Sequence, residues 1–64
     1  MQTAIFNDNT RKKILFTTFY DLIITGNYKY EGYSKEEQGH VYTQKKSNNG
    51  YPIKLIDHRT ERRL

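Results

Sequence analysis

Short apolar clusters, separated by polar turn residues, run along the whole chain. Residues 4–6 form the first cluster, and the Asn and Asp side chains of residues 7–10 favour a turn because they bond nearby backbone groups. Beyond Gly26, Tyr28 and Tyr30 alternate with charged residues, which is typical of a strand with one aromatic and one charged face. The pattern therefore predicts short strands joined by tight turns.

Residues 11–25 fit two different elements. Their apolar side chains recur at helical spacing, but most of them are β-branched or aromatic and prefer strands. Three consecutive cations at residues 11–13 would also oppose the positive end of a helix dipole. We therefore expect two strands, broken near residues 20–21. The alternative is a helix over the segment, capped by Thr10 and ended by Gly26.

Two local signals shape the second half of the chain. Ser34 and Glu37 match a capping box, in which a hydroxyl and a carboxylate satisfy each other's backbone amides, so we expect one helical turn at residues 34–38. Farther on, Ser-Asn-Asn-Gly at residues 47–50 separates two strand-like segments. This spacing predicts a β-hairpin in which Gly50 takes a positive φ.

A three-residue Asn-Asn-Gly loop would also fix the register of the hairpin. It places Val41 and Thr43 opposite Ile53 and Leu55, all on the core side. The outward side chains are then Tyr42, Gln44, Lys46 and Lys54. Because a slip of one residue would exchange the two faces, the basic and aromatic character of the outer face depends on this register.

These signals together predict a mostly β fold, a small antiparallel sheet or barrel-like domain with a C-terminal β-hairpin. The alternative is an α+β fold with residues 11–25 helical. The 64 residues form a single domain, 1–64, in which 58–64 is a basic tail. A chain this short buries only about 60% of its unfolded surface. A homodimer, or ordering against a partner, would supply the support that a thin core lacks.

Composition excludes several classes of protein. The chain has no cysteine, hence no disulfide or thiolate ligand, and two histidines are too few for a metal site, so we expect no metal or cofactor. No apolar run approaches the roughly 18 residues that cross a bilayer, and the first residues lack the order of a signal peptide. We therefore expect a cytoplasmic protein.

The favoured residues have AT-rich codons, which suggests a low-GC bacterium or one of its bacteriophages as the source. In its small size, basic charge and lack of cysteine, the chain is similar to bacteriophage early proteins that modulate host machinery or defence. That resemblance implies the host cytoplasm as its location.

The net charge lies entirely in the last 25 residues. Residues 1–39 sum to zero, whereas residues 40–64 contain six basic and two acidic side chains and carry the full +4. Such segregation indicates a surface for a polyanion, and tyrosines among the cations suit stacking on unpaired bases. No motif that reads duplex DNA is present, so we expect non-enzymatic binding of RNA rather than DNA. The expected contacts are Lys45, Lys46, Lys54, Arg59, Arg62 and Arg63, with Tyr42 and Tyr51 as stacking residues.

Two other functions would use the same part of the chain. Tyr and Arg are enriched at interface hot spots, so the chain could instead be a protein-binding inhibitor of a bacterial enzyme such as a toxin ribonuclease. Its partner would then be an acidic or RNA-bound protein, which would attract the same basic hairpin. His40 and His58 flank the predicted hairpin and could serve as acid and base in a metal-free ribonuclease. The simpler interpretation of both histidines is that they are ordinary strand-end residues, and we expect no enzymatic activity.

Overall fold

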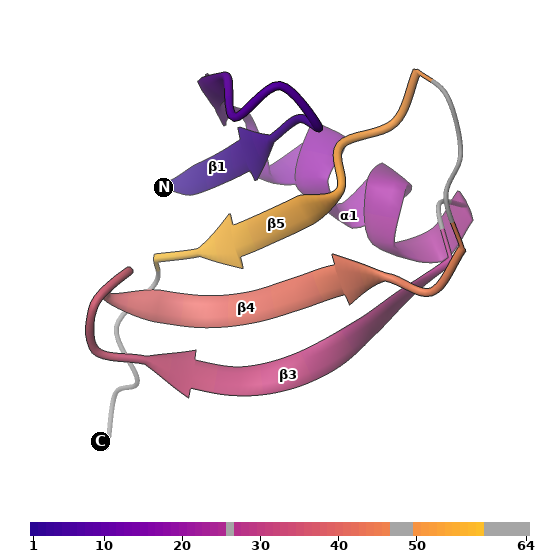
Figure 1. Cartoon of the computed structure of the whole chain (residues 1–64). Helices are drawn as coiled ribbons and strands as arrows, with labels where there is room; N and C mark the ends of the chain where they lie inside the picture. The colour runs from indigo at the N-terminus through magenta and orange to yellow at the C-terminus, as the bar shows by residue number, and fades with distance from the viewer. Residues whose placement is uncertain (26, 47–49, 59–64) are drawn as a thin grey trace.

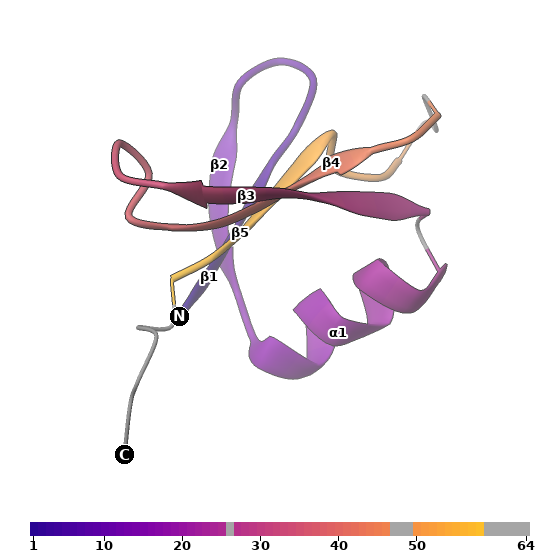
Figure 2. The same cartoon turned by 90° about the horizontal axis from the view of Figure 1, so that it is seen from below.

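The computed structural model describes residues 1–25, 27–46 and 50–58. Its elements are β1 (Gln2–Ile5), β2 (Arg11–Ile14), α1 (Phe16–Thr25), β3 (Tyr28–Ser34), β4 (Gly39–Gln44) and β5 (Lys54–Asp57). The strands form one antiparallel sheet in the order β2-β1-β5-β4-β3, and α1 lies against one of its faces (Figures 1 and 2). The mostly β prediction is confirmed, in its open-sheet form rather than as a barrel.

The ambiguous segment 11–25 is divided between a strand and a helix. Residues 11–14 form β2, whereas residues 16–25 form α1, so the prediction of two strands is wrong for the second part. The three cations lie before the helix rather than in its first turn, so they do not oppose its dipole. Phe19 is buried against the sheet, and this burial outweighs the strand preference of the neighbouring residues.

The predicted turn at residues 7–10 is confirmed, and it joins β1 to β2. The amide of Phe6 donates to the carbonyl of Thr10 (2.9 Å), and the carboxylate of Asp8 accepts from the amide of Thr10 (3.0 Å). The hydrogen bonds from the side chain and backbone of Thr10 lower the pKa of Asp8. Asn9 has a φ of 69°, a conformation that asparagine adopts more readily than most residues.

The predicted capping box forms only in part. The amide of Glu37 donates to the hydroxyl of Ser34 (3.1 Å), as expected, but the carboxylate of Glu37 forms an ion pair with Arg11. Residues 35–38 make a turn between β3 and β4 instead of a helical turn, so that prediction is wrong. Gln38 closes the turn with a φ of 58°.

The pairing of β4 with β5 is antiparallel, as predicted for the hairpin, but its register is not the predicted one. Tyr42 lies opposite Leu55, and Val41 lies opposite Ile56. The side chain of Tyr42 therefore faces α1 rather than the outside. The predicted assignment of faces is wrong because the observed register is offset by one residue from the one that a three-residue loop would give.

That connection runs over residues 45–53. The amide of Gln44 still donates to the carbonyl of Ile53 (3.0 Å), which extends the pairing beyond the strands themselves. Gly50 has a φ of 87°, so its predicted positive φ is confirmed. The two asparagines of the predicted Asn-Asn-Gly loop, at residues 48 and 49, lie outside the described residues.

The sheet has one core cluster on each face. On the face that α1 covers, the helix face, the buried residues are Ala4, Phe19, Tyr28 and Leu55. On the other, the open face, they are Ile5, Val41 and Ile56. The ion pair between Arg11 and Glu37 spans the open face. Arg11 lies on the edge strand β2, and Glu37 lies in the turn that connects the opposite edge strand, β3, to β4.

Candidate nucleic-acid interface

The register places cations from three strands in one row across the open face. Ile5 lies opposite Arg11 on one side and Lys54 on the other, Lys54 lies opposite Thr43, and Thr43 lies opposite Lys29. Residues that lie opposite each other project from the same face of a sheet. With strands about 4.8 Å apart, consecutive cations of this row are about 10 Å apart at the backbone. We call Arg11, Lys54 and Lys29 the cation row.

Further cations surround the cation row. Lys13 projects from the same face, opposite Thr3. Lys45 and Lys46 are exposed and follow the end of β4, where the amide of Lys45 donates to the carbonyl of Asn27 (2.9 Å). Lys45 and Lys46 therefore lie at the end of the sheet where β5 begins and where Lys54 is placed.

Two carboxylates lie close to the cation row. Glu31 is 3.8 Å from the amine of Lys29 and accepts a hydrogen bond from the hydroxyl of Thr43 (2.5 Å), and Glu37 pairs with Arg11. Both ion pairs are partly exposed, so each contributes little to stability and can exchange for a contact with phosphate. Among the described residues, Lys54 has no ion pair.

The structure separates the residues that the sequence grouped into one site. Lys54 is half-buried on the open face, and Lys45 and Lys46 are exposed at its end. Tyr42 instead lies on the helix face, where its ring meets that of Phe19 edge-on at 5.6 Å. Its position at the edge of the core does not favour stacking on a base bound at the open face.

The remaining predicted RNA contacts are Tyr51 and three arginines of the tail. Tyr51 is half-buried in the connection between β4 and β5. The predicted contacts of the tail are Arg59, Arg62 and Arg63, which fall outside the described residues. Charge counting along the chain missed Arg11, Lys13 and Lys29, because acids elsewhere in the first 39 residues cancel them. The alternation of Lys29 with Tyr28 and Tyr30 signalled only that Lys29 lies on the face opposite those two rings.

The two histidines lie on opposite faces of the sheet. His40 is opposite Asp57 and shares its face, so His58, the next residue, projects to the other face. Nε2 of His58 lies 2.9 Å from the hydroxyl of Thr3, and Nδ1 lies 3.2 Å from the carbonyl of Gln38. Both ring nitrogens of His58 are thus engaged. This arrangement does not favour joint acid and base work by the two histidines on one phosphodiester.

An aromatic cluster occupies the helix face beside β3. Tyr30 and Tyr33 are each more than half exposed, and the hydroxyl of Tyr30 lies 2.8 Å from Nδ1 of His40. The ring of Tyr33 meets the ring of His40 edge-on, with centroids 5.2 Å apart. Tyr30 and Tyr33 are the most accessible of the described tyrosines on the sheet, and Tyr20 on α1 is exposed to the same degree.

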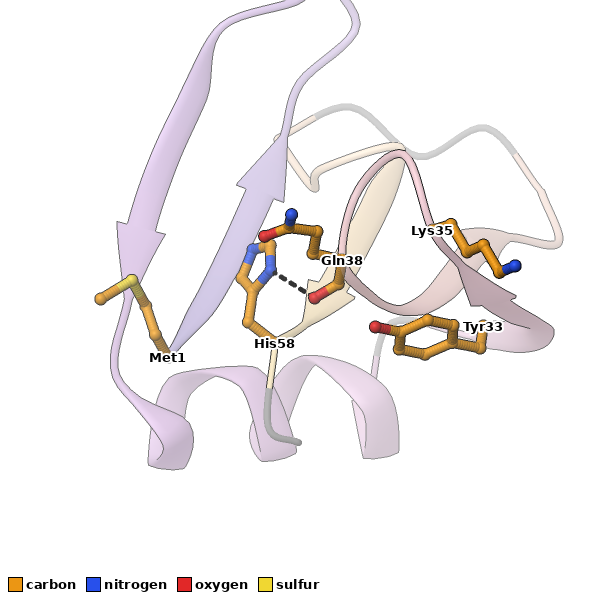
Figure 3. A pocket seen from close by; sticks show the side chains of 5 residues that line it. All are labelled: Met1, Tyr33, Lys35, Gln38 and His58. Atoms are coloured by element: carbon orange, nitrogen blue, oxygen red, sulfur yellow. Dashed lines mark hydrogen bonds between the residues drawn. The ribbon is translucent and has the colours of Figure 1, made fainter. Parts of the chain in front are cut away.

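A cavity of about 540 Å³ lies at the end of the sheet away from Lys45 and Lys46. Its lining residues are Met1, Tyr33, Lys35, Gln38 and His58 (Figure 3). Figure 3 shows the hydroxyl of Tyr33 turned toward Gln38 and His58. An aromatic ring, an amide and an amine around one cavity suit a flat polar group such as an unpaired base.

Other kinds of site find no support in the described part of the chain. There, no group of three or more His, Asp or Glu residues could hold a metal ion. None of the helical structure described is long and apolar enough to cross a membrane. No model of a protein family, no curated protein and no solved structure matches the chain. The geometry of the open face is therefore the feature that indicates a function.

Proposed function

We propose that the chain binds single-stranded RNA through the open face and catalyses no reaction. The observation that carries the proposal is the cation row, Arg11, Lys54 and Lys29, which crosses the sheet on the face that α1 leaves uncovered. Evenly spaced cations on an uncovered sheet can follow a phosphate backbone whatever its sequence. Lys45 and Lys46 extend this surface at one end, and the cavity beside Tyr33 can receive an unstacked base at the other.

The helix argues for a single strand rather than a duplex. A recognition helix that enters the major groove presents basic and amide side chains to the bases and phosphates. The only charged residue of α1 is Asp21, and the helix contains neither Lys nor Arg. A partner that leaves α1 aside and contacts the sheet is therefore the better fit.

RNA binding also fits a particular cellular location and class of protein. Binding RNA in the cytoplasm of a bacterial host would suit a bacteriophage protein that modulates host or defence machinery, the class that the composition resembles. No cofactor or metal is required for such binding, because neutralised phosphates and stacked bases supply the affinity.

The test is a titration of labelled single-stranded RNA at several salt concentrations. Lys54→Gln and Lys29→Gln keep most of each side chain and remove its charge, so each should flatten the plot of log affinity against log salt by about 0.7. Lys12→Gln is the matched control, since Lys12 lies opposite Ala4 and therefore projects from the helix side of the same sheet. Binding that ignores salt, or an equal loss in all three variants, would overturn the proposal.

A further inference from the structure

The edge strand β3 presents two exposed tyrosines on one face although they are three residues apart. Tyr30 lies opposite Tyr42, and Tyr33 lies opposite His40, so both project from the helix face. In a regular strand, residues three apart project from opposite faces. The register shift between Tyr30 and Gly32 is a β-bulge, and Gly32 has a φ of 113°. The bulge turns Tyr33 to the side of Tyr30, and bulges that re-aim a side chain are frequent beside functional sites.

We call Tyr30 and Tyr33 the tyrosine pair, and both rings are held by their neighbours. The ring of Tyr30 packs against that of Tyr42, with centroids 5.2 Å apart, and its hydroxyl bonds Nδ1 of His40. The ring of Tyr33 packs against the same His40. Tyr30 and Tyr33 are nevertheless 54% and 56% exposed. Because these rings are already oriented, a base that stacks on them costs little further conformational entropy.

The tyrosine pair lies where the cation row ends. Lys29, the last cation of the row, is the neighbour of Tyr30 in β3 and projects from the open face. Because β3 is an edge strand of the described sheet, only the width of this strand separates the two side chains. On the basis of the proposed RNA binding, we infer that Tyr30 and Tyr33 stack on unpaired bases of the same strand whose phosphates contact the cation row. The strand then passes around the edge of β3.

The charges beside the tyrosine pair favour a nucleotide. Glu31 is the only acidic residue of β3, and it bonds Thr43 on the open face, so no carboxylate of β3 lies beside the two rings. Lys35 follows β3 and lines the cavity together with Tyr33 (Figure 3). An amine beside an exposed ring suits the phosphate of a stacked nucleotide. Since every base has a flat aromatic face, the pair should accept bases of any identity.

Titration of a labelled oligouridine at several salt concentrations tests the inference. Tyr30→Leu and Tyr33→Leu remove the ring and keep an apolar side chain, so each should weaken binding by about 5- to 150-fold. The slope of log affinity against log salt should stay the same, because no charge is removed. Tyr33→Phe restores the ring and should recover most of the affinity lost in Tyr33→Leu. On an abasic strand of the same length, the loss caused by Tyr30→Leu should disappear.

Tyr20→Leu is the matched control, because Tyr20 is as exposed as Tyr30 but lies on α1, and it should leave the affinity unchanged. Circular dichroism should show that all variants fold like the unmodified chain. If Lys29→Gln flattens the salt plot while both leucine variants of the tyrosine pair bind like the unmodified chain, the inference is overturned and the proposed function stands. Equal weakening by Tyr20→Leu, or a loss that persists on the abasic strand, also overturns the inference. RNA binding that ignores salt overturns both.

Discussion

The two faces of the sheet reach the same burial by different means. Leu55 and Ile56 are neighbours in β5, project from opposite faces and are both 0% exposed. A helix anchored by Phe19 covers Leu55. On the face of Ile56, no helix is found among the described residues, and the ion pair between Arg11 and Glu37 spans the sheet.

The difference shows how one thin sheet can carry two surfaces of opposite character. A covering helix also has an exposed surface of its own, and on α1 this surface includes the apolar side chains of Phe16, Tyr20 and Ile24. Long cationic side chains cover apolar neighbours with their stems and keep their charged ends in water. The cationic side chains of the open face therefore cover a core cluster with their stems and form a surface for anions with their charged ends.

The largest expected effect comes from removing the anchor of the helix face. Phe19→Ala leaves a cavity under α1 and should lower the free energy of unfolding by about 3 to 5 kcal/mol. The corresponding truncation on the open face, Ile56→Ala, should cost about 2 to 5 kcal/mol. Urea unfolding followed by circular dichroism measures both. A loss at Phe19 well below that at Ile56 would show that α1 contributes little to the fold.

A second change tests how closely β4 approaches β5. A Cβ atom on Gly39 would lie 2.7 Å from the carbonyl oxygen of Asp57 and 2.8 Å from Cγ2 of Ile56. Gly39→Ala must move backbone as well as side chain, so it should cost about 1 to 3 kcal/mol. Thermal unfolding measures the loss, with Lys46→Ala as an exposed control. An unchanged midpoint would contradict the close approach.

Tyr28 gives a third, smaller effect on the helix face. Its hydroxyl donates to the carbonyl of Pro52, so Tyr28→Phe leaves that carbonyl unpaired and should cost about 1 to 2 kcal/mol. The loss should appear in urea unfolding at neutral pH.

The same residue also predicts a pH dependence. Burial, with a smaller contribution from Tyr51, raises the pKa of Tyr28 from 10.0 to about 12. Between these values the unfolded chain releases a proton that the folded chain keeps, so stability falls as the pH rises. The part of this loss of stability that comes from the ionisation of Tyr28 should be absent in Tyr28→Phe. Parallel stability curves for the two proteins from pH 9 to about 12 would contradict it.

The smallest effect sharpens the role of the open face. Glu37→Gln removes the ion pair with Arg11, and an exposed pair of this type contributes only about 0 to 1 kcal/mol to stability. It also frees the guanidinium for phosphate, so RNA should bind more tightly and with a steeper salt dependence. Glu36→Gln, an exposed carboxylate in the same turn, is the control. Weaker binding after Glu37→Gln would argue against a role for Arg11.

Local chemistry was predictable wherever one residue type controls the backbone. Asp8 and Asn9 make the expected turn, Gly50 has the expected positive φ, and the hydroxyl of Ser34 accepts the expected amide. These features depend on neighbours within a few residues. The helix at residues 16–25 was missed because its strand-prone residues become helical only when Phe19 packs on a sheet assembled from distant segments.

The candidate site, too, was predictable from the sequence only in part. Lys45 and Lys46 could be located from sequence, because their exposure follows from a polar connection. Tyr42 could not, because the observed register is offset by one residue from that of a three-residue loop, which turns its ring toward α1. The partners of Lys54 across the sheet, Arg11 and Lys29, come from strands that no local pattern aligns.

The sequence by itself determined the class of the fold, its turns and the excess of positive charge. Alternation, turn residues and net charge are properties of neighbouring residues or of composition, and no long-range contact alters them. Only the tertiary structure decided which face each cation occupies and which apolar residues stay outside. Both depend on strand register and on the packing of α1, which are set by contacts between segments far apart in the chain.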